Sequence, residues 1–176
     1  MLTIITPCYR QKNLQNLYQS IDFQKIDKWI IVYDTSRNRT YTKIFSHVQI
    51  QEEYCDTLGE AGHAQRNYGV DLVKEGHIYF LDDDNVIHEQ FWNLEFNDLN
   101  TFYTFDQQRN QDFILKGNNL VKDYIDTAMF VVPKFMFAGN PWRIHEYSAD
   151  GYFVESIKNN KHVYYPVTAA YYNKLS

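Results

Sequence analysis

A short apolar run that ends in three aspartates places the tightest constraint on how this chain folds. The segment His77–Leu81 has the length and composition of a buried strand, and polar residues bound it. Asp82, Asp83 and Asp84 follow at once, so they fall at the carboxyl end of that strand. In open α/β sheets, ligands bind at this end of the strands. The three carboxylates therefore mark the expected ligand-binding edge.

Three adjacent carboxylates repel one another at neutral pH, and a divalent cation relieves this repulsion. Hard cations such as Mg2+ prefer carboxylate oxygen, and an ion held by one or two carboxylates keeps positions open for phosphate oxygens. On an extended segment, Asp82 and Asp84 lie on the same side. The pattern predicts a metal site for a nucleotide-linked substrate, in which one of these two carboxylates meets the ribose or the metal and the other meets the metal and phosphates. The alternative interpretation is an acidic turn that caps the following helix.

Length and charge limit the classes of protein that the chain can represent. Its 176 residues suggest one domain. The net charge is -5, and Lys and Arg form no cluster that could follow a phosphate backbone, which argues against nucleic acid as a partner. No stretch has the length needed to span a bilayer. Any membrane contact is therefore expected to be peripheral.

The two cysteines and the first residues indicate a compartment. Cys8 and Cys55 lie on different segments, and nothing in the sequence demands a disulfide. Residues 1–9 have the pattern of a strand and lack the charged and long apolar regions of a secretory signal. We therefore expect the protein in the cytoplasm.

Strand and helix patterns alternate along the first half of the chain, which predicts βαβ units and a parallel sheet. The second half is less regular. The sequence thus predicts a single α/β domain over 1–176, with a nucleotide-binding half at about 1–85 and a mixed, acceptor-side half at about 86–176. The expected strands are Leu2–Pro7, Trp29–Tyr33, His47–Ile50, Ile78–Leu81, Thr101–Phe105, Phe113–Lys116, Ala128–Val132 and His162–Tyr165, and the expected helices are Asn13–Ile21, Gly62–Lys74, Glu89–Leu99 and Ser148–Lys158.

Two further segments carry candidate ligand contacts in the first half. Asp34 ends the second expected strand, where its carboxylate can accept a hydrogen bond from a base N–H or a ribose hydroxyl. Gly59 and Gly62 flank a helix start and allow a ligand to approach closely, and Arg66 in the first turns can grip a phosphate or the base. The structural alternatives are a turn aspartate and a capped helix with a solvated arginine.

Two residues of the second half are candidates for the reaction and for the acceptor. Asp150 begins an expected helix and can serve as general base for an acceptor hydroxyl, although an N-cap is the commoner role of such an aspartate. Trp142 is placed to stack on an acceptor sugar, and its alternative role is packing under its loop.

In order along the chain, these segments resemble nucleotide-sugar glycosyltransferases of the GT-A type, both the inverting family 2 enzymes and the animal β-1,3-glucuronyltransferases. Asp34 falls where they carry a base-contacting aspartate, and Asp150 where they carry the catalytic carboxylate. The resemblance covers about residues 3 to 155. The matching segments are Thr6–Tyr9 with their Thr-Pro-x-Tyr, Gly62–Asn67 with Gly-Val-Glu-Gln-Arg-Asn, Ile78–Asn85 with Val-Tyr-Phe-Ala-Asp-Asp-Asp-Asn, and Asp126–Phe130 with Asp-Met-Ala-Gly-Phe.

The resemblance implies a GT-A fold, an Mn2+ or Mg2+ ion, a UDP-sugar donor, a carbohydrate or glycoconjugate acceptor, and inversion at the anomeric carbon. Two departures stand out. Ala61 replaces an arginine of the glucuronyltransferases, which argues against a glucuronate donor, and their C-terminal Trp-His-Thr phosphate contact is not found. The implied nucleotide-sugar contacts are Thr6, Pro7, Tyr9, Asp34, Gly62, Arg66, Asp82 and Asp83, the implied metal ligands are Asp84 and Asp82, and the implied catalytic base is Asp150.

Other classes fit the sequence less well. In a phosphatase of the haloacid-dehalogenase type, Asp82 would be the nucleophile and Asp84 the general acid. That motif usually closes the first strand, whereas two βα units precede it here, and no late Gly-Asp-x-x-x-Asp motif follows. A sugar-1-phosphate nucleotidyltransferase would need a Gly-rich, Lys-containing N-terminal loop. A non-catalytic sugar-binding protein would keep the aromatic residues without needing the aspartate triplet, Arg66 and Asp150 together.

Overall fold

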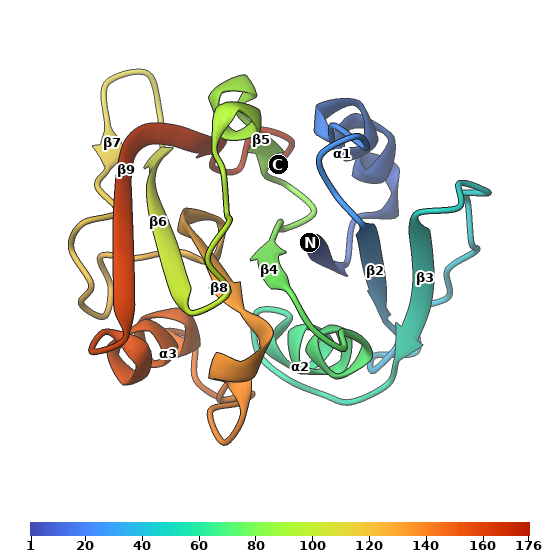
Figure 1. Ribbon diagram of the computed structural model, residues 1–176. Helices are drawn as coiled ribbons and strands as arrows, with labels where there is room; N and C mark the ends of the chain where they lie inside the picture. The colour runs from blue at the N-terminus through green and yellow to red at the C-terminus, as the bar shows by residue number, and fades with distance from the viewer.

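The computed structural model describes residues 1–176, and a nine-stranded sheet forms its centre. The strand order is β3-β2-β1-β4-β8-β6-β9-β5, and β7 pairs with β6 outside this path. In this spatial order, the strands β3, β2, β1 and β4 are parallel to one another. β8 runs antiparallel to β4 and β6, and β9 is parallel to β6 (Figure 1). The strands are β1 (Leu2–Cys8), β2 (Lys28–Asp34), β3 (Ile50–Cys55), β4 (His77–Phe80), β5 (Val86–Ile87), β6 (Thr101–Gln108), β7 (Ile114–Leu115), β8 (Phe130–Pro133) and β9 (Lys161–Tyr171).

The helices lie on both faces of this sheet. α1 packs on one face with the short helix η2, whereas α2, α3 and η4 pack on the other, as Figure 1 shows for α1, α2 and α3. The pairing of β4 with β8 joins the two predicted halves of the chain into one sheet. None of the helices has the length and apolar character that a bilayer crossing needs. The helices are η1 (Gln11–Asn13), α1 (Leu14–Ser20), α2 (His63–Leu72), η2 (Glu89–Asn93), η3 (Thr127–Met129), η4 (Lys134–Phe137) and α3 (Ala149–Ile157).

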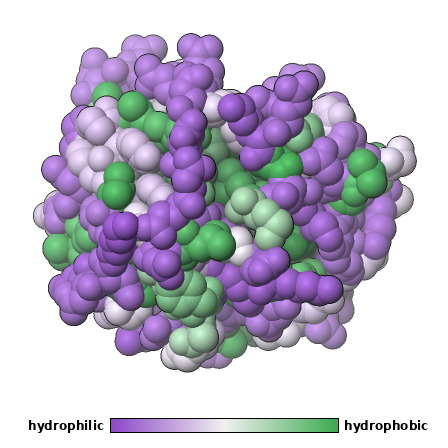
Figure 2. Space-filling model, viewed as in Figure 1, coloured by the Kyte–Doolittle hydropathy of each residue, from purple (hydrophilic) through white to green (hydrophobic).

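The central strands read as unbroken apolar runs because the sheet is buried on both faces. Successive side chains of a strand point to opposite faces. In β1, Ile4 lies in the core under α1, and Ile5 lies in the core under α2. In β4, Tyr79 lies in the core under α1, and Phe80 lies in the core under α2. Each core contains 20 buried residues, so the helices cover the sheet on both sides. In Figure 2, hydrophilic side chains cover most of the visible face, and apolar ones gather mainly in a central strip.

The predicted α/β class is confirmed, and most predicted elements lie within a few residues of their observed bounds. The strand predicted at His47–Ile50 is wrong, because β3 begins only at Ile50. His47 explains the difference: its carbonyl oxygen accepts a hydrogen bond from the N–H of Ile50 and its Nδ1 accepts one from the N–H of Gln49, so residues 47–50 form a turn. β3 is an edge strand with mixed burial, so its apolar pattern is weak.

The helix predicted at Glu89–Leu99 is also wrong in its second half. Only the 3-10 turn Glu89–Asn93 forms, and an irregular segment leads from it to β6. Asp98 accepts hydrogen bonds from the backbone N–H of Asn100 and the hydroxyl of Thr101. Such local side-chain bonds compete with helix formation and favour a turn.

The contact between α2 and β1 depends on a residue without a side chain. A Cβ atom added at Gly69 would lie 2.6 Å from Cγ2 of Ile5. Gly69→Ala gains about 1 kcal/mol of helix propensity, yet overpacking costs about 1–3 kcal/mol, so we expect a lower free energy of unfolding. Asp71→Ala, at an exposed position of the same helix, is the control and should change stability little. Urea denaturation of both variants decides, and a Gly69→Ala variant as stable as wild type would contradict the packing argument.

Candidate active site

The parallel strands bring the predicted site residues to one edge of the sheet. β1, β2 and β4 end side by side, and α2 begins above the same edge with His63. A cavity of about 880 Å3 opens there. The predicted residues that line it are Pro7, Tyr9, Arg66, Asp82, Asp83, Asp84 and Asp150.

Asp83 ties the end of β1 to the end of β4. Its side chain is 2% exposed. Oδ2 accepts hydrogen bonds from the backbone N–H groups of Tyr9 and Arg10, each at 2.5 Å, and Oδ1 lies 2.6 Å from Nη1 of Arg10. With both oxygens engaged by neighbouring protein groups, Asp83 shapes the turn and offers little to a ligand.

Asp82 and Asp84 face the cavity from either side of Asp83. Asp82 forms an ion pair with Nη2 of Arg66 and accepts a hydrogen bond from the hydroxyl of Thr127 at 3.2 Å. Nη1 of Arg10 lies 3.1 Å from Oδ2 of Asp84. Burial, and then the negative charge of Asp82, raise the pKa of Asp84 to about 6. An added cation would relieve this unfavourable charge.

The residues present fit a divalent cation held by few protein ligands. No group of three or more His, Cys, Asp or Glu side chains in the structure could hold a metal ion. Asp82 and Asp84 line the same cavity, however, and two carboxylates suffice for a cation that keeps positions for phosphate oxygens. The raised pKa of Asp84 shows that its negative charge lacks full compensation in the protein.

Arg66 is a buried cation at the cavity wall. Its side chain is 3% exposed, Nη1 donates to the carbonyl oxygen of Ala61 at 2.6 Å, and Nε has no partner. His63 lies one helical turn before it, and burial together with the charge of Arg66 lowers the pKa of His63 to about 4. The imidazole is therefore neutral, and the positive charge at this wall belongs to the arginine.

Two predicted nucleotide contacts, Thr6 and Gly62, lie behind the cavity wall instead of on it. Thr6 is fully buried, and its hydroxyl accepts a hydrogen bond from Nε1 of Trp29 at 2.9 Å. Gly62 packs against Pro7, because an added Cβ atom would lie 2.7 Å from the proline Cβ. The expected direct ligand contacts of Thr6 and Gly62 are thus replaced by packing roles.

Asp34 is also withdrawn from the cavity. Its 2% exposed side chain accepts hydrogen bonds from Ser36 and Gln65 and forms an ion pair with Arg39 at 3.0 Å. Arg39 lines the cavity and lies over the ring of Tyr9, 5.0 Å from its centroid. The structure therefore places an arginine where the sequence predicted a carboxylate contact.

Asp150 reaches the cavity from the first turn of α3. It is not the N-cap, which is Ser148, and its only hydrogen bond is with the adjacent N–H of Gly151 at 2.8 Å. Burial, and then the charge of Asp126, raise the pKa of Asp150 to about 7. A carboxylate with a pKa near neutrality is suited to accept a proton.

The predicted acceptor contact by Trp142 is wrong, because its indole is buried and presents no free face to a sugar. It is 2% exposed and stacks on His63 and Phe153, with ring centroids 5.6 Å and 5.2 Å away. Among the aromatic residues that line the cavity, Tyr147 is 78% exposed. Sequence reasoning missed Tyr147, although it stands three residues before Asp150.

The C-terminal segment packs on the aspartate turn. The N–H of Leu175 donates to the carbonyl oxygen of Asp84, and the N–H of Asn173 donates to Oδ1 of Asn85. The side-chain amide of Asn13 donates to the carbonyl oxygens of Asp83 and Leu175. Tyr172 and Asn173 thereby line the cavity, which no motif in the sequence indicates.

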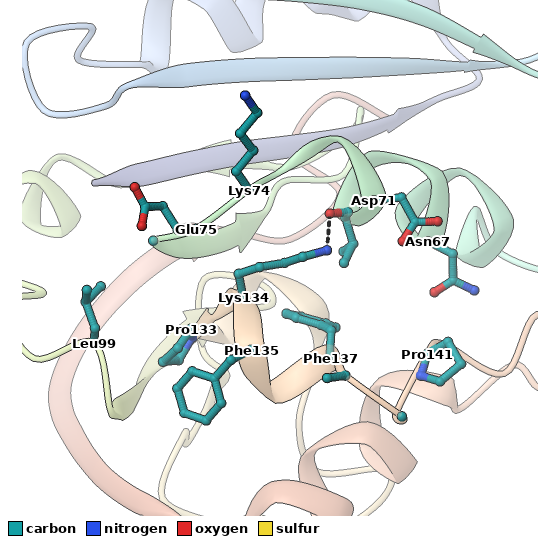
Figure 3. A pocket seen from close by; sticks show the side chains of 14 residues that line it. Asn67, Asp71, Lys74, Glu75, Leu99, Pro133, Lys134, Phe135, Phe137 and Pro141 are labelled. Carbon is teal, nitrogen blue, oxygen red and sulfur yellow. Dashed lines mark hydrogen bonds between the residues drawn. The ribbon is translucent and has the colours of Figure 1, made fainter.

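A second cavity, of about 900 Å3, lies at the other end of α2 and contains none of the predicted site residues. Figure 3 shows its wall of Phe135, Phe137 and proline rings, and Lys134 reaching across it to the carbonyl oxygen of Val70. The same carbonyl oxygen also accepts a hydrogen bond from the backbone N–H of Val73, at the end of α2. The cavity carries no grouping that resembles a reaction centre.

The unequal roles of Asp83 and Asp84 lead to a stability prediction. Asp83→Asn keeps the shape but loses a charged acceptor, so we expect the free energy of unfolding to fall by about 1.5–3 kcal/mol. Asp84→Asn should be as stable as wild type or more so, because a raised pKa means that the ionised carboxylate is disfavoured in the folded state. Denaturation at neutral pH with a chelator tests this, and equal stability of the two variants would refute the assignment.

Comparison with known proteins adds to this geometry. No family model and no curated protein sequence matches the chain. Solved structures of S. aureus TarS do share its fold. The structure of TarS 1-349 superimposes with a TM-score of 0.68 at 13% identity, over 97% of this chain and 59% of that chain.

The match extends to two TarS complexes. The structure with UDP has a TM-score of 0.67 at 12% identity, and the structure with UDP-GlcNAc has a TM-score of 0.66 at 13% identity. They cover 97% of this chain and 59% and 57% of theirs. This chain therefore spans less than two thirds of those chains, and identities this low show the fold alone. The chain therefore shares the mixed α/β, Rossmann-like fold of TarS, in agreement with the fold class expected from the sequence.

Proposed function

We propose that this chain is an inverting, metal-dependent glycosyltransferase that moves a sugar from a nucleotide diphosphate sugar to an acceptor hydroxyl. One observation carries the proposal. A buried arginine, two cavity-facing carboxylates next to β4 and a carboxylate of raised pKa converge on one cavity from three separate segments. The proposed donor is a UDP-sugar, because the fold is shared with TarS structures that contain UDP and UDP-GlcNAc. The proposed acceptor is a carbohydrate or glycoconjugate.

The donor would bind between the cations and carboxylates of the cavity. Arg66 is held by Asp82 and by Ala61, so its guanidinium is fixed before any ligand arrives and can pair with a phosphate at little entropic cost. Asp84 and Asp82 would hold an Mn2+ or Mg2+ ion, which when bound neutralises the diphosphate and stabilises the leaving group. We propose a cytoplasmic reaction, since Cys8 and Cys55 are both buried free thiols.

Asp150 would act in the same cavity as the general base. It lies on α3, remote in sequence from the aspartates after β4, and shares the cavity with them. Its deprotonated carboxylate would take the proton of an acceptor hydroxyl as that oxygen attacks the anomeric carbon. In-line attack from the face opposite the leaving diphosphate gives inversion.

The cation is tested by UDP binding. We expect wild type to bind UDP much more tightly with Mn2+ than with a chelator, and Asp84→Asn to lose that difference while staying folded. Asp71→Asn, which removes a carboxylate from the other cavity, is the matched control. Titration calorimetry measures the UDP affinity of all three proteins with Mn2+ and with a chelator. An Mn2+ effect of wild-type size in Asp84→Asn would contradict the assignment of Asp84 as a metal ligand.

The base is tested by hydrolysis of UDP-sugars, beginning with UDP-GlcNAc, in which water replaces the acceptor. Only the deprotonated form of Asp150 accepts a proton, so the rate should rise with pH through about 7. Asp150→Asn should cut the rate by about 10²–10⁴-fold and flatten this rise, with donor affinity nearly unchanged. A near wild-type rate in the variant would remove Asp150 from the mechanism.

The phosphatase alternative makes an opposite prediction. β4 is the fourth strand along the chain, and Asp82 is already paired with Arg66. We therefore expect no hydrolysis of p-nitrophenyl phosphate with Mg2+. Robust hydrolysis that disappears in Asp82→Asn would replace the transferase proposal.

A further inference from the structure

One arginine bridges the two carboxylates of the aspartate turn that lie nearest to β1. Nη1 of Arg10 lies 2.6 Å from Oδ1 of Asp83 and 3.1 Å from Oδ2 of Asp84. Arg10 follows β1, whereas the aspartates follow β4. A single guanidinium therefore neutralises part of the turn from a neighbouring strand.

The anchoring of Arg10 differs from that of Arg66. The side chain of Arg66 is 3% exposed and held on several sides, whereas the side chain of Arg10 is 44% exposed. The backbone of Arg10 is fixed, because its N–H donates to Oδ2 of Asp83 at 2.5 Å. Asp83 also accepts from the N–H of Tyr9, so the turn keeps two main-chain bonds if the guanidinium moves. The charged end of Arg10 is thus free to leave without loss of the turn.

We propose that Arg10 is an exchangeable counter-ion of the cation site. It neutralises Asp84 in the free protein, leaves Asp84 when a divalent cation binds there, and then pairs with a phosphate of the donor. This inference rests on the proposed cation site. A guanidinium and a divalent cation at one carboxylate repel each other strongly in a partly buried site. The same guanidinium donors suit carboxylate and phosphate oxygens alike.

The exchange of Arg10 couples the binding of the metal ion to the binding of the donor. Without a nucleotide, a divalent cation has to displace Arg10 from Asp84, which lowers its affinity. With a diphosphate present, the displaced guanidinium gains a new partner in the same cavity, so the cost is offset. Metal and nucleotide each then raise the affinity of the other by the same factor.

Metal binding to the nucleotide-free protein tests the exchange directly. We expect Arg10→Gln to bind Mn2+ about tenfold more tightly than wild type, since the competing charge-assisted contact is gone. Arg37→Gln is the matched control, because Arg37 lines the same cavity but forms no ion pair. Its loss removes one positive charge from the cavity without removing a contact to Asp84. Adding Asp84→Asn to Arg10→Gln should remove the gain. Titration calorimetry with MnCl2 alone measures these affinities.

The second arm measures UDP at saturating Mn2+, where Arg10→Gln should bind at least about fivefold more weakly than wild type. The inference is overturned if Arg10→Gln gains no more Mn2+ affinity than Arg37→Gln, or if no variant binds Mn2+. Should Arg10→Gln unfold below the assay temperature, Arg10→Lys tests the inference instead. Its single ammonium contacts fewer carboxylate oxygens than a guanidinium does, so this variant must also bind Mn2+ more tightly than wild type. UDP binding and UDP-sugar hydrolysis by wild type judge the proposed function separately from these outcomes.

Discussion

The carboxylate of Asp83 joins the ends of two neighbouring strands, and the shape of the cavity depends on this contact. It receives the main-chain N–H groups that follow β1 and holds them against the turn that follows β4. The neighbouring Asp82 and Asp84 are thereby presented to the cavity, with Arg10 beside them. A residue that a motif marks as a ligand contact is here the one that gives the other two their positions.

The sequence predicted well what depends on local pattern and strand order. The apolar run into the aspartates requires a buried strand, and parallel strands must end at one edge, so Arg66 and Asp84 could be expected in one place, whereas Asp150 was expected there only from the resemblance. Side-chain direction was harder to predict. Thr6 and Trp142 lie on suitable segments, but hydrogen bonding in one case and aromatic stacking in the other turn them into the core.

Residues on irregular segments escaped prediction altogether. Arg39 enters the cavity because Asp34 and Tyr9 hold its guanidinium, and Tyr172 enters because its N–H donates to the carbonyl oxygen of Gln108. The hydrophobic periodicity of the sequence indicates neither contact. His47 shows the same limit within the fold, since hydrogen bonds to its carbonyl oxygen and its imidazole form a turn where a strand was predicted.

Environment divides the carboxylates of this edge into two kinds. Asp34 and Asp83 are buried but receive charged and neutral donors on both oxygens, so they serve the structure. Asp84 and Asp150 are poor in donors, and burial with neighbouring negative charge raises the pKa of each. A bound cation would favour the ionised form of Asp84, whereas burial, and then the charge of Asp126, keep the pKa of Asp150 near neutrality, so one cavity can hold a metal ligand and a base.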